Sequence, residues 1–238
     1  MSLFKHFSFD LWLTLIRSNP AFKQERAAYF HKHYNKLDKS LQEIEAAFRF
    51  VDVMTNAINE RTGKNIDSDE MYLAVISHIN ENTFSLKDVD TETLYVKMQD
   101  LLFAHMPRLY SEETREVLEL VKDDEQRTAS ILSNTGFIKG STLRQVLVHL
   151  DIDKYFDFQF YSDEEGMSKP NTSFFLKMTN EVFARRGLSP KDIIHIGDNS
   201  RADIEGATSV GIHSLLINAN ENTISKLLPY VTGHILTT

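Results

Sequence analysis

Residues 6–15 read HFSFDLWLTL, and this stretch decides the fold class. Apolar Phe7 and Phe9 alternate with the polar His6 and Ser8, which is the pattern of a β-strand with one buried face. Asp10 follows the alternation directly. The stretch therefore predicts a strand that ends at an acidic residue.

The chain beyond this strand changes to a helical pattern that continues to about residue 106. Ser40 and Glu43 form a capping-box sequence in front of a long apolar periodicity, and Asp67 and Asp90 suit the caps of two more helices. We expect helices in this segment and no strand between residues 16 and 107.

Short apolar segments alternate with helical segments after residue 107. Strands are expected at residues 128–132, 156–161, 192–196 and 212–217, and helices at 111–122 (with Ser111 as its cap), 141–150, 172–186 and 201–210. Strands separated by helices indicate βαβ crossovers and a parallel sheet covered on both faces. The sequence thus predicts an α/β protein with a Rossmann-like core formed by residues 1–16 and 108–238, and a helical insertion at residues 17–107.

The composition excludes several classes of protein. The 238 residues are 42% hydrophobic and 25% charged, which permits a buried core and excludes a disordered chain. The net charge of −8 argues against binding to nucleic acid or to an anionic membrane surface. The lack of cysteine excludes thiol catalysis, and no signal peptide or apolar run of about 18 residues is found. We expect a cytoplasmic protein that neither binds nucleic acid nor enters a membrane.

Polar side chains follow the predicted strands at the points where those strands end. Parallel sheets place binding and catalytic sites at the carboxyl ends of their strands. The residues expected there are Asp10, Ser133, Asn134, Lys169, Asp198 and Asp203. Any one of them alone would be read as a turn or helix-cap residue, but the whole set in this order indicates a catalytic site.

The order of these segments resembles the haloacid dehalogenase-like (HAD) hydrolases with a helical cap inserted after the first strand. FDLWLT is similar to the first motif of that family, usually DxDxT, and LSN, SKP and IGDNSRAD are similar to the second, third and fourth motifs. The resemblance covers the predicted core by motif order and the cap by position and helical character. It implies a HAD-like core with an α-helical cap domain.

The resemblance also implies roles for the strand-end residues. Asp10 is expected to be the nucleophile that forms an aspartyl-phosphate, with Ser133 and Lys169 in catalytic roles. Ser133, the backbone amides near Asn134, and Lys169 are expected to hold the phosphoryl oxygens.

The expected metal ion is Mg²⁺, since clustered carboxylates repel one another unless a cation offsets their charge. The family pattern gives Asp10, Asp198 and the backbone carbonyl of Trp12 as its ligands, while Asp203 either binds the metal or orients Lys169.

Trp12 departs from the phosphatase pattern, in which this position is a second aspartate that acts as general acid and base. An indole N–H cannot act as a general acid or base at ordinary pH. An aromatic residue at this position is a feature of the dehalogenases of the same superfamily, which use no metal. Dehalogenases, however, replace the acid that Asp198 provides here. The sequence therefore favours a Mg²⁺-dependent phosphatase acting on a small phosphorylated metabolite.

Two alternatives are a 2-haloacid dehalogenase-type hydrolase and a catalytically impaired module that binds a phosphorylated ligand. Trp12 and Arg17 are expected to contact the substrate. The substrate and the oligomeric state are left open by the sequence.

Overall fold

A five-stranded parallel sheet forms the centre of the protein in the computed structural model, which describes residues 3–217 and 223–233. The strand order is β5-β4-β1-β6-β7, so the first strand is central and hydrogen-bonds to β4 on one side and β6 on the other. The strands are β1 His6–Phe9, β4 Thr128–Ser133, β5 Phe158–Tyr161, β6 Ile193–Gly197 and β7 His213–Leu216. All four β1 residues are buried, polar His6 and Ser8 included, so this central strand is covered on both faces rather than on the one face that its alternation predicts. The predicted parallel α/β sheet is confirmed.

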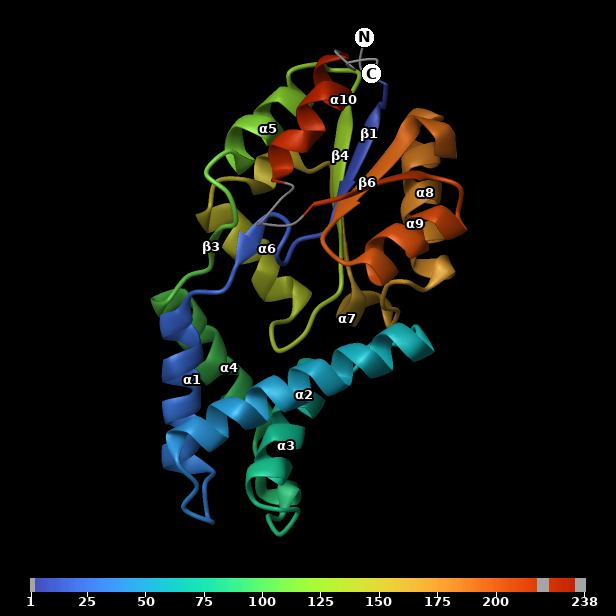
Figure 1. Ribbon diagram of the computed structural model, residues 1–238. Coiled ribbons are helices and arrows are strands. Elements are labelled where there is room, and N and C mark those ends of the chain that lie inside the picture. The colour runs from blue at the N-terminus through green and yellow to red at the C-terminus, as the bar shows by residue number, and fades with distance from the viewer. Residues whose placement is uncertain (1–2, 218–222, 234–238) are drawn as a thin grey trace.

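Helices cover both faces of this sheet (Figure 1). On one face lie α5 Thr114–Lys122, α6 Gly140–His149 and α10 Leu228–Thr232, and on the other α8 Thr172–Arg186 and α9 Gly206–Ser209. Each face has its own apolar cluster, built around Phe7 and Phe9 on one side and Phe174 and Phe175 on the other. The carboxyl ends of β1 and β4 point towards the remaining helices.

The inserted segment forms a helical cap with a separate apolar core (Figure 1). Its helices are α1 Pro20–His33, α2 Leu41–Thr62, α3 Ser68–Ile79 and α4 Thr91–Ala104. The predicted caps are confirmed: Ser40 and Glu43 form a capping box on α2, Asp67 begins α3 with another, and Asp90 accepts a backbone hydrogen bond at the start of α4. We propose residues 17–107 as the cap domain and residues 1–16 with 108–238 as the core domain; residues 1–2, 218–222 and 234–238 lie outside the described part.

The expectation of no strand between residues 16 and 107 is wrong at residues 16 and 17. Strands β2 Ile16–Arg17 and β3 Arg108–Leu109 form an antiparallel ribbon where the chain enters and leaves the cap. Two residues are too few to show an alternation of apolar and polar side chains, so these strands could not be predicted from periodicity.

Other local differences concern turns and short helices. The segment predicted as one helix at residues 201–210 begins as a π-helical turn, Ser200–Glu205, followed by α9. A short helix, α7 Ser162–Glu165, was not expected, and Ser111 accepts the N–H of Glu113 rather than capping α5 directly. Short 3-10 turns occur at Leu86–Asp88, Asp153–Tyr155, Pro190–Asp192 and Ile224–Leu227. Among the described residues, no helix is both long and apolar enough to cross a membrane.

Candidate active site

Three carboxylates meet at the carboxyl edge of the sheet. Asp10 follows β1, Asp198 follows β6, and Asp203 lies in the π-helical turn after β6. One oxygen from each of the three lies within 4.8 Å of the others. Asp10 and Asp203 are buried and Asp198 is half-buried, so the three charges gather where water screens them poorly.

Lys169 provides the positive charge of the cluster. Its side chain is buried, and Nζ lies 2.6 Å from Asp10 Oδ1 and 2.6 Å from Asp203 Oδ1. Burial disfavours the charged ammonium, but the attraction of Asp10 and Asp203 outweighs that cost and raises the pKa of Lys169 above its ordinary value. Lys169 is therefore a fixed cation that bridges the two acids.

Asn134 positions Lys169 through the backbone. Asn134 Oδ1 accepts the Lys169 N–H at 2.7 Å, and Asn134 Nδ2 donates to the Lys169 carbonyl at 3.0 Å. The sequence predicted Asn134 as a substrate-binding residue, and the structure shows that its side-chain amide is already engaged with the lysine loop. Its remaining route to a substrate is the backbone N–H.

Asp203 is held on every side by donors. Oδ1 accepts from Lys169 and from His195 Nε2 at 3.1 Å, and Oδ2 accepts the Asn199 N–H at 3.0 Å. The lysine and histidine hold the pKa of Asp203 well below its usual range despite burial. Gly197 makes room for this arrangement, since a Cβ there would lie 2.2 Å from Asp203 Cγ.

His195 supports Asp203 from the sheet, a role that the sequence did not reveal. Burial lowers its pKa, and the hydrogen bond with Asp203 opposes that shift. With Nε2 donating to Asp203, Nδ1 accepts from Ser8 Oγ at 2.9 Å. Ser8 and His195 stand on neighbouring strands, and their alternation in β1 and β6 was the only sequence signal that they face the same side.

The turn after Asp10 fixes the orientation of the predicted nucleophile. Thr14 Oγ1 donates to Asp10 Oδ2 at 3.1 Å, and Leu13 has the left-handed φ of 59° that turns the chain back. Trp12 is half-buried against the apolar core cluster, and its backbone forms a bridge to Ile16. The structure thus places an indole, with no acid, two residues after Asp10.

The other predicted substrate-binding residues are placed differently. Ser133 is buried at the end of β4, and its hydroxyl donates to the Asn134 carbonyl at 3.1 Å. Arg17 is exposed on the β2–β3 ribbon, and within the described part of the chain no hydrogen bond or ion pair joins it to the site. The structure therefore brings Ser133 to the strand ends with the acids, but gives no contact that brings Arg17 there.

The acidic cluster fits a divalent cation. Burial, and then repulsion by Asp10 and Asp203, raise the pKa of Asp198 to about 7, so a third ionised carboxylate is unfavourable here without a cation. Mg²⁺ prefers carboxylate, carbonyl and water oxygens. Asp10, Asp198 and the carbonyl of Trp12 match that preference. Asp203 accepts a hydrogen bond from Lys169, which supports its predicted role of orienting that lysine, while its role as a metal ligand stays a prediction.

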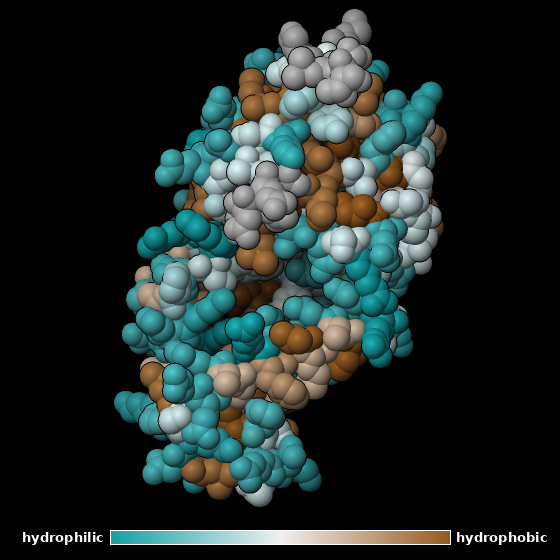
Figure 2. Space-filling model, in the orientation of Figure 1, coloured by the Kyte–Doolittle hydropathy of each residue, from teal (hydrophilic) through white to brown (hydrophobic). Residues whose placement is uncertain are grey.

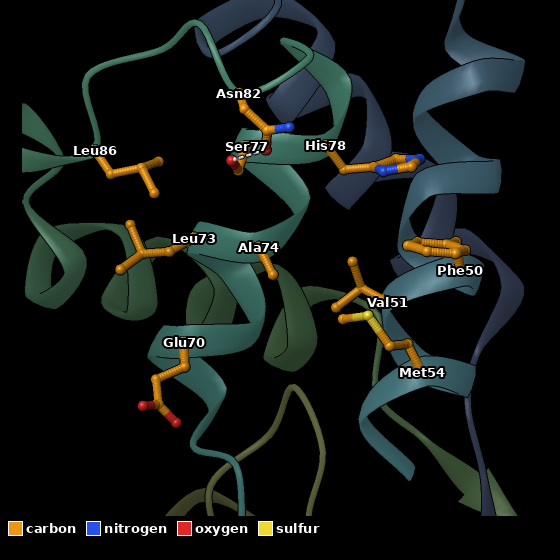
Figure 3. Close-up of a pocket in the computed structure, with 10 residues that line it drawn as sticks. All are labelled: Phe50, Val51, Met54, Glu70, Leu73, Ala74, Ser77, His78, Asn82 and Leu86. Atoms are coloured by element: carbon orange, nitrogen blue, oxygen red, sulfur yellow. Dashed lines mark hydrogen bonds between the residues drawn. The ribbon is translucent and has the colours of Figure 1, made fainter. Parts of the chain in front are cut away.

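A different hollow lies on the outer side of the cap (Figure 3). Its volume is about 470 Å³, and α2 and α3 line it mostly with apolar side chains such as Phe50, Met54 and Leu73. Phe50 stacks on His78 with ring centres 4.5 Å apart. None of the three site carboxylates lines it, and it gives no support for catalysis.

Comparison with known proteins agrees with the fold. Residues 8–217 match the family model for haloacid dehalogenase-like hydrolases, so the chain belongs to that family and is a HAD-like hydrolase. The structure is similar to that of the HAD-hydrolase YfnB from Bacillus subtilis bound to magnesium (TM-score 0.73, 18% identity, 96% of this chain and 99% of that one). It is also similar to a 2-haloacid dehalogenase from Pseudomonas syringae (TM-score 0.64, 17% identity, 97% and 99%).

Relatives by sequence include phosphatases. A glyceraldehyde 3-phosphate phosphatase from Methanothermobacter thermautotrophicus is 35% identical over 82 residues, and the match spans 34% of each chain, about a third of the length of that relative. Haloacid dehalogenase-like hydrolase domain-containing protein 3 from Mus musculus is 25% identical over 75% of this chain and 68% of its own length. The substrate in the name of a relative is a statement about that relative.

Proposed function

We propose that the protein is a Mg²⁺-dependent phosphatase that acts on a small phosphorylated metabolite through an aspartyl-phosphate on Asp10. The observation that carries the proposal is the retained Asp198, which completes a three-carboxylate cluster with one lysine. Relatives that are phosphatases support it. A cytoplasmic location also stays a prediction.

The proposed reaction has two displacement steps. A carboxylate oxygen of Asp10 bonds to phosphorus while the bond from phosphorus to the leaving oxygen breaks. Water then attacks the same phosphorus, which releases phosphate and restores the Asp10 carboxylate. Lys169 and Ser133 would neutralise and orient the phosphoryl oxygens, and Thr14 keeps Asp10 in position. When bound, Mg²⁺ supplies charge neutralisation beside the phosphoryl group.

With Trp12 at this position, the leaving group lacks the usual proton donor. The acids that follow β5 are engaged in ion pairs in the structure, Glu164 with Arg144 and Glu165 with Lys177. Esters whose leaving groups are stable anions, such as aryl and acyl phosphates, should therefore react faster than alkyl phosphates.

One observation favours a second candidate, a 2-haloacid dehalogenase-type hydrolase: an aromatic side chain stands at Trp12. Against it, a 2-haloacid would bring a further carboxylate to a cluster that already holds three. A third candidate keeps phosphate binding but has lost turnover together with the acid at position 12.

A substrate screen separates the three. Aryl, acyl and alkyl phosphates and 2-haloacids are incubated with the protein, with Mg²⁺ or with a chelator, beside the Asp10→Asn variant. Mg²⁺-dependent phosphate release that Asp10→Asn abolishes supports the phosphatase. Halide release without Mg²⁺ would overturn it, and phosphate-ester binding without turnover would identify the impaired module.

A further inference from the structure

Helix α2 of the cap carries a row of side chains at a spacing of four residues, Phe48, Asp52, Asn56 and Glu60. Residues four apart on a helix are neighbours on the same side. The row is therefore a continuous strip along the helix, about 18 Å long at a rise of about 1.5 Å per residue.

The strip contacts the core at both ends. The Phe48 ring meets the Phe137 ring with centres 5.3 Å apart, and Asp52 Oδ1 lies 3.7 Å from where a Cβ would stand on Gly136. At the other end Glu60 Oε1 accepts from Asn199 Nδ2 at 3.0 Å. The strip thus runs from the loop after β4 to the loop after β6.

The middle of the strip spans the distance between these two loops, which flank the end of β1. In the sheet, β1 stands between β4 and β6, so the end of β1 with Asp10 lies between the two loops that the strip touches. Asn56 is halfway between Asp52 and Glu60. Figure 1 shows α2 passing beneath the carboxyl ends of the strands, and Figure 2 shows the surface hollowed between core and cap.

Asn56 and Asp52 have free hydrogen-bonding capacity at this place. Both side chains are exposed, and within residues 3–217 and 223–233 neither side-chain head group forms a hydrogen bond or ion pair. Although the Asp52 side chain reaches solvent, the protein around it desolvates the carboxylate and raises its pKa, while the nearby Arg26 and Lys23 offset part of that shift. A carboxylate already balanced in this way suits a neutral hydroxyl donor better than a second cation. An amide such as Asn56 both donates to and accepts from a hydroxyl.

The geometry points to Asn56 and Asp52 as the residues that select the leaving group, and to phosphate esters of hydroxylated carbon chains, of the polyol or sugar type, as the substrate class. This inference rests on the proposed phosphatase function, since it concerns the part of the ester that departs from phosphorus. Glu60, held by Asn199, fixes the end of the strip rather than contacting substrate.

The experiment compares two inert phosphonates, dihydroxybutyl phosphonate and butyl phosphonate, by calorimetry with Mg²⁺ present. The wild-type protein should bind the hydroxylated compound more tightly. Asn56→Leu and Asp52→Ala should each reduce that preference by about 3- to 10-fold, the effect of one lost hydrogen bond, without changing affinity for butyl phosphonate. Asp100→Ala, which removes an exposed carboxylate on α4, is the matched control and should change neither.

Equal binding of the two phosphonates by the wild type, or an unchanged preference in both variants, would overturn the inference. The outcome is separable from the proposed function, because phosphonate binding needs no turnover. If the protein hydrolyses no phosphate ester but still prefers the hydroxylated phosphonate, the phosphatase proposal fails and the role of Asn56 and Asp52 stands. If it hydrolyses phosphate esters but lacks that preference, the phosphatase proposal stands and the role of Asn56 and Asp52 fails.

Discussion

Replacing Lys169 by methionine should destabilise the protein strongly and make it depend on a divalent cation. Methionine keeps the length of the buried stem and removes the charge. Asp10 and Asp203, each 2.6 Å from Nζ, then lose their shared partner while remaining almost wholly buried, with side chains 9% and 1% exposed. Two carboxylates would face each other with no cation from the protein.

The expected magnitude follows from this burial. Removing one partner of a buried ion pair costs about 3–5 kcal/mol of unfolding free energy, since the remaining charge stays desolvated. Asp10 keeps the hydrogen bond from Thr14, and Asp203 keeps those from His195 and Asn199, so we expect the loss to lie within this range rather than above it. Mg²⁺ should restore stability in proportion to its occupancy of the native state.

Urea unfolding measures the effect, with a chelator and then with Mg²⁺. Lys154→Met is the control: Lys154 pairs with Asp151 on the surface, where the two side chains are 51% and 65% exposed, so the expected change is about 0–1 kcal/mol. Mg²⁺ should stabilise Lys169→Met more than the wild type. The reasoning is refuted if Lys169→Met in chelator is no less stable than Lys154→Met, or if Mg²⁺ stabilises both equally.

Three further predictions concern other parts of the molecule. Burial lowers the pKa of His6 from 6.5 to about 3. Below pH 6.5 the unfolded chain therefore takes up this proton before the folded protein does, and the free energy of unfolding decreases as the pH is lowered. His6→Asn should therefore make the slope of unfolding free energy between pH 6.5 and about pH 4 shallower, by about 1.4 kcal/mol per pH unit, and an unchanged slope would contradict this. Asp198→Ala should abolish Mg²⁺ binding in calorimetry while circular dichroism stays native; equal affinity would place the metal elsewhere. Trp12→Asp should raise turnover of alkyl phosphates by about 10²–10⁴-fold, the usual value of general acid–base help, and no gain would mean that another residue supplies the proton.

The sheet could be predicted because its strands are short, buried and separated by helices. In β1 and β6 every residue is buried, and each strand is followed directly by an aspartate that matches a family motif. The acids and the lysine could be assigned from the same feature, since the carboxyl ends of parallel strands meet at one edge. Their convergence on a single cluster follows from the strand order rather than from any one residue.

The supporting contacts could not be predicted, because they join segments that are distant in sequence. Nothing in the Asn134 stretch shows that its amide would clamp the backbone of Lys169, and His195 reads as an ordinary core residue until the register places it beside Ser8 and Asp203. The docking of α2 on the loops after β4 and β6 depends likewise on tertiary packing. Periodicity defined the buried side of α2 but gave no signal for which part of the core its flank would face.

The identity of the nucleophile is the central claim, and mass spectrometry of a quenched reaction tests it most directly. The protein is mixed with an acyl phosphate and Mg²⁺, denatured in acid within the first turnover, and digested. We predict that the peptide containing Asp10 gains the mass of one phosphoryl group, and that the corresponding peptide of Asp10→Asn does not. Phosphate release by the wild type with no phosphoryl group on Asp10 at any time during the turnover would contradict the account.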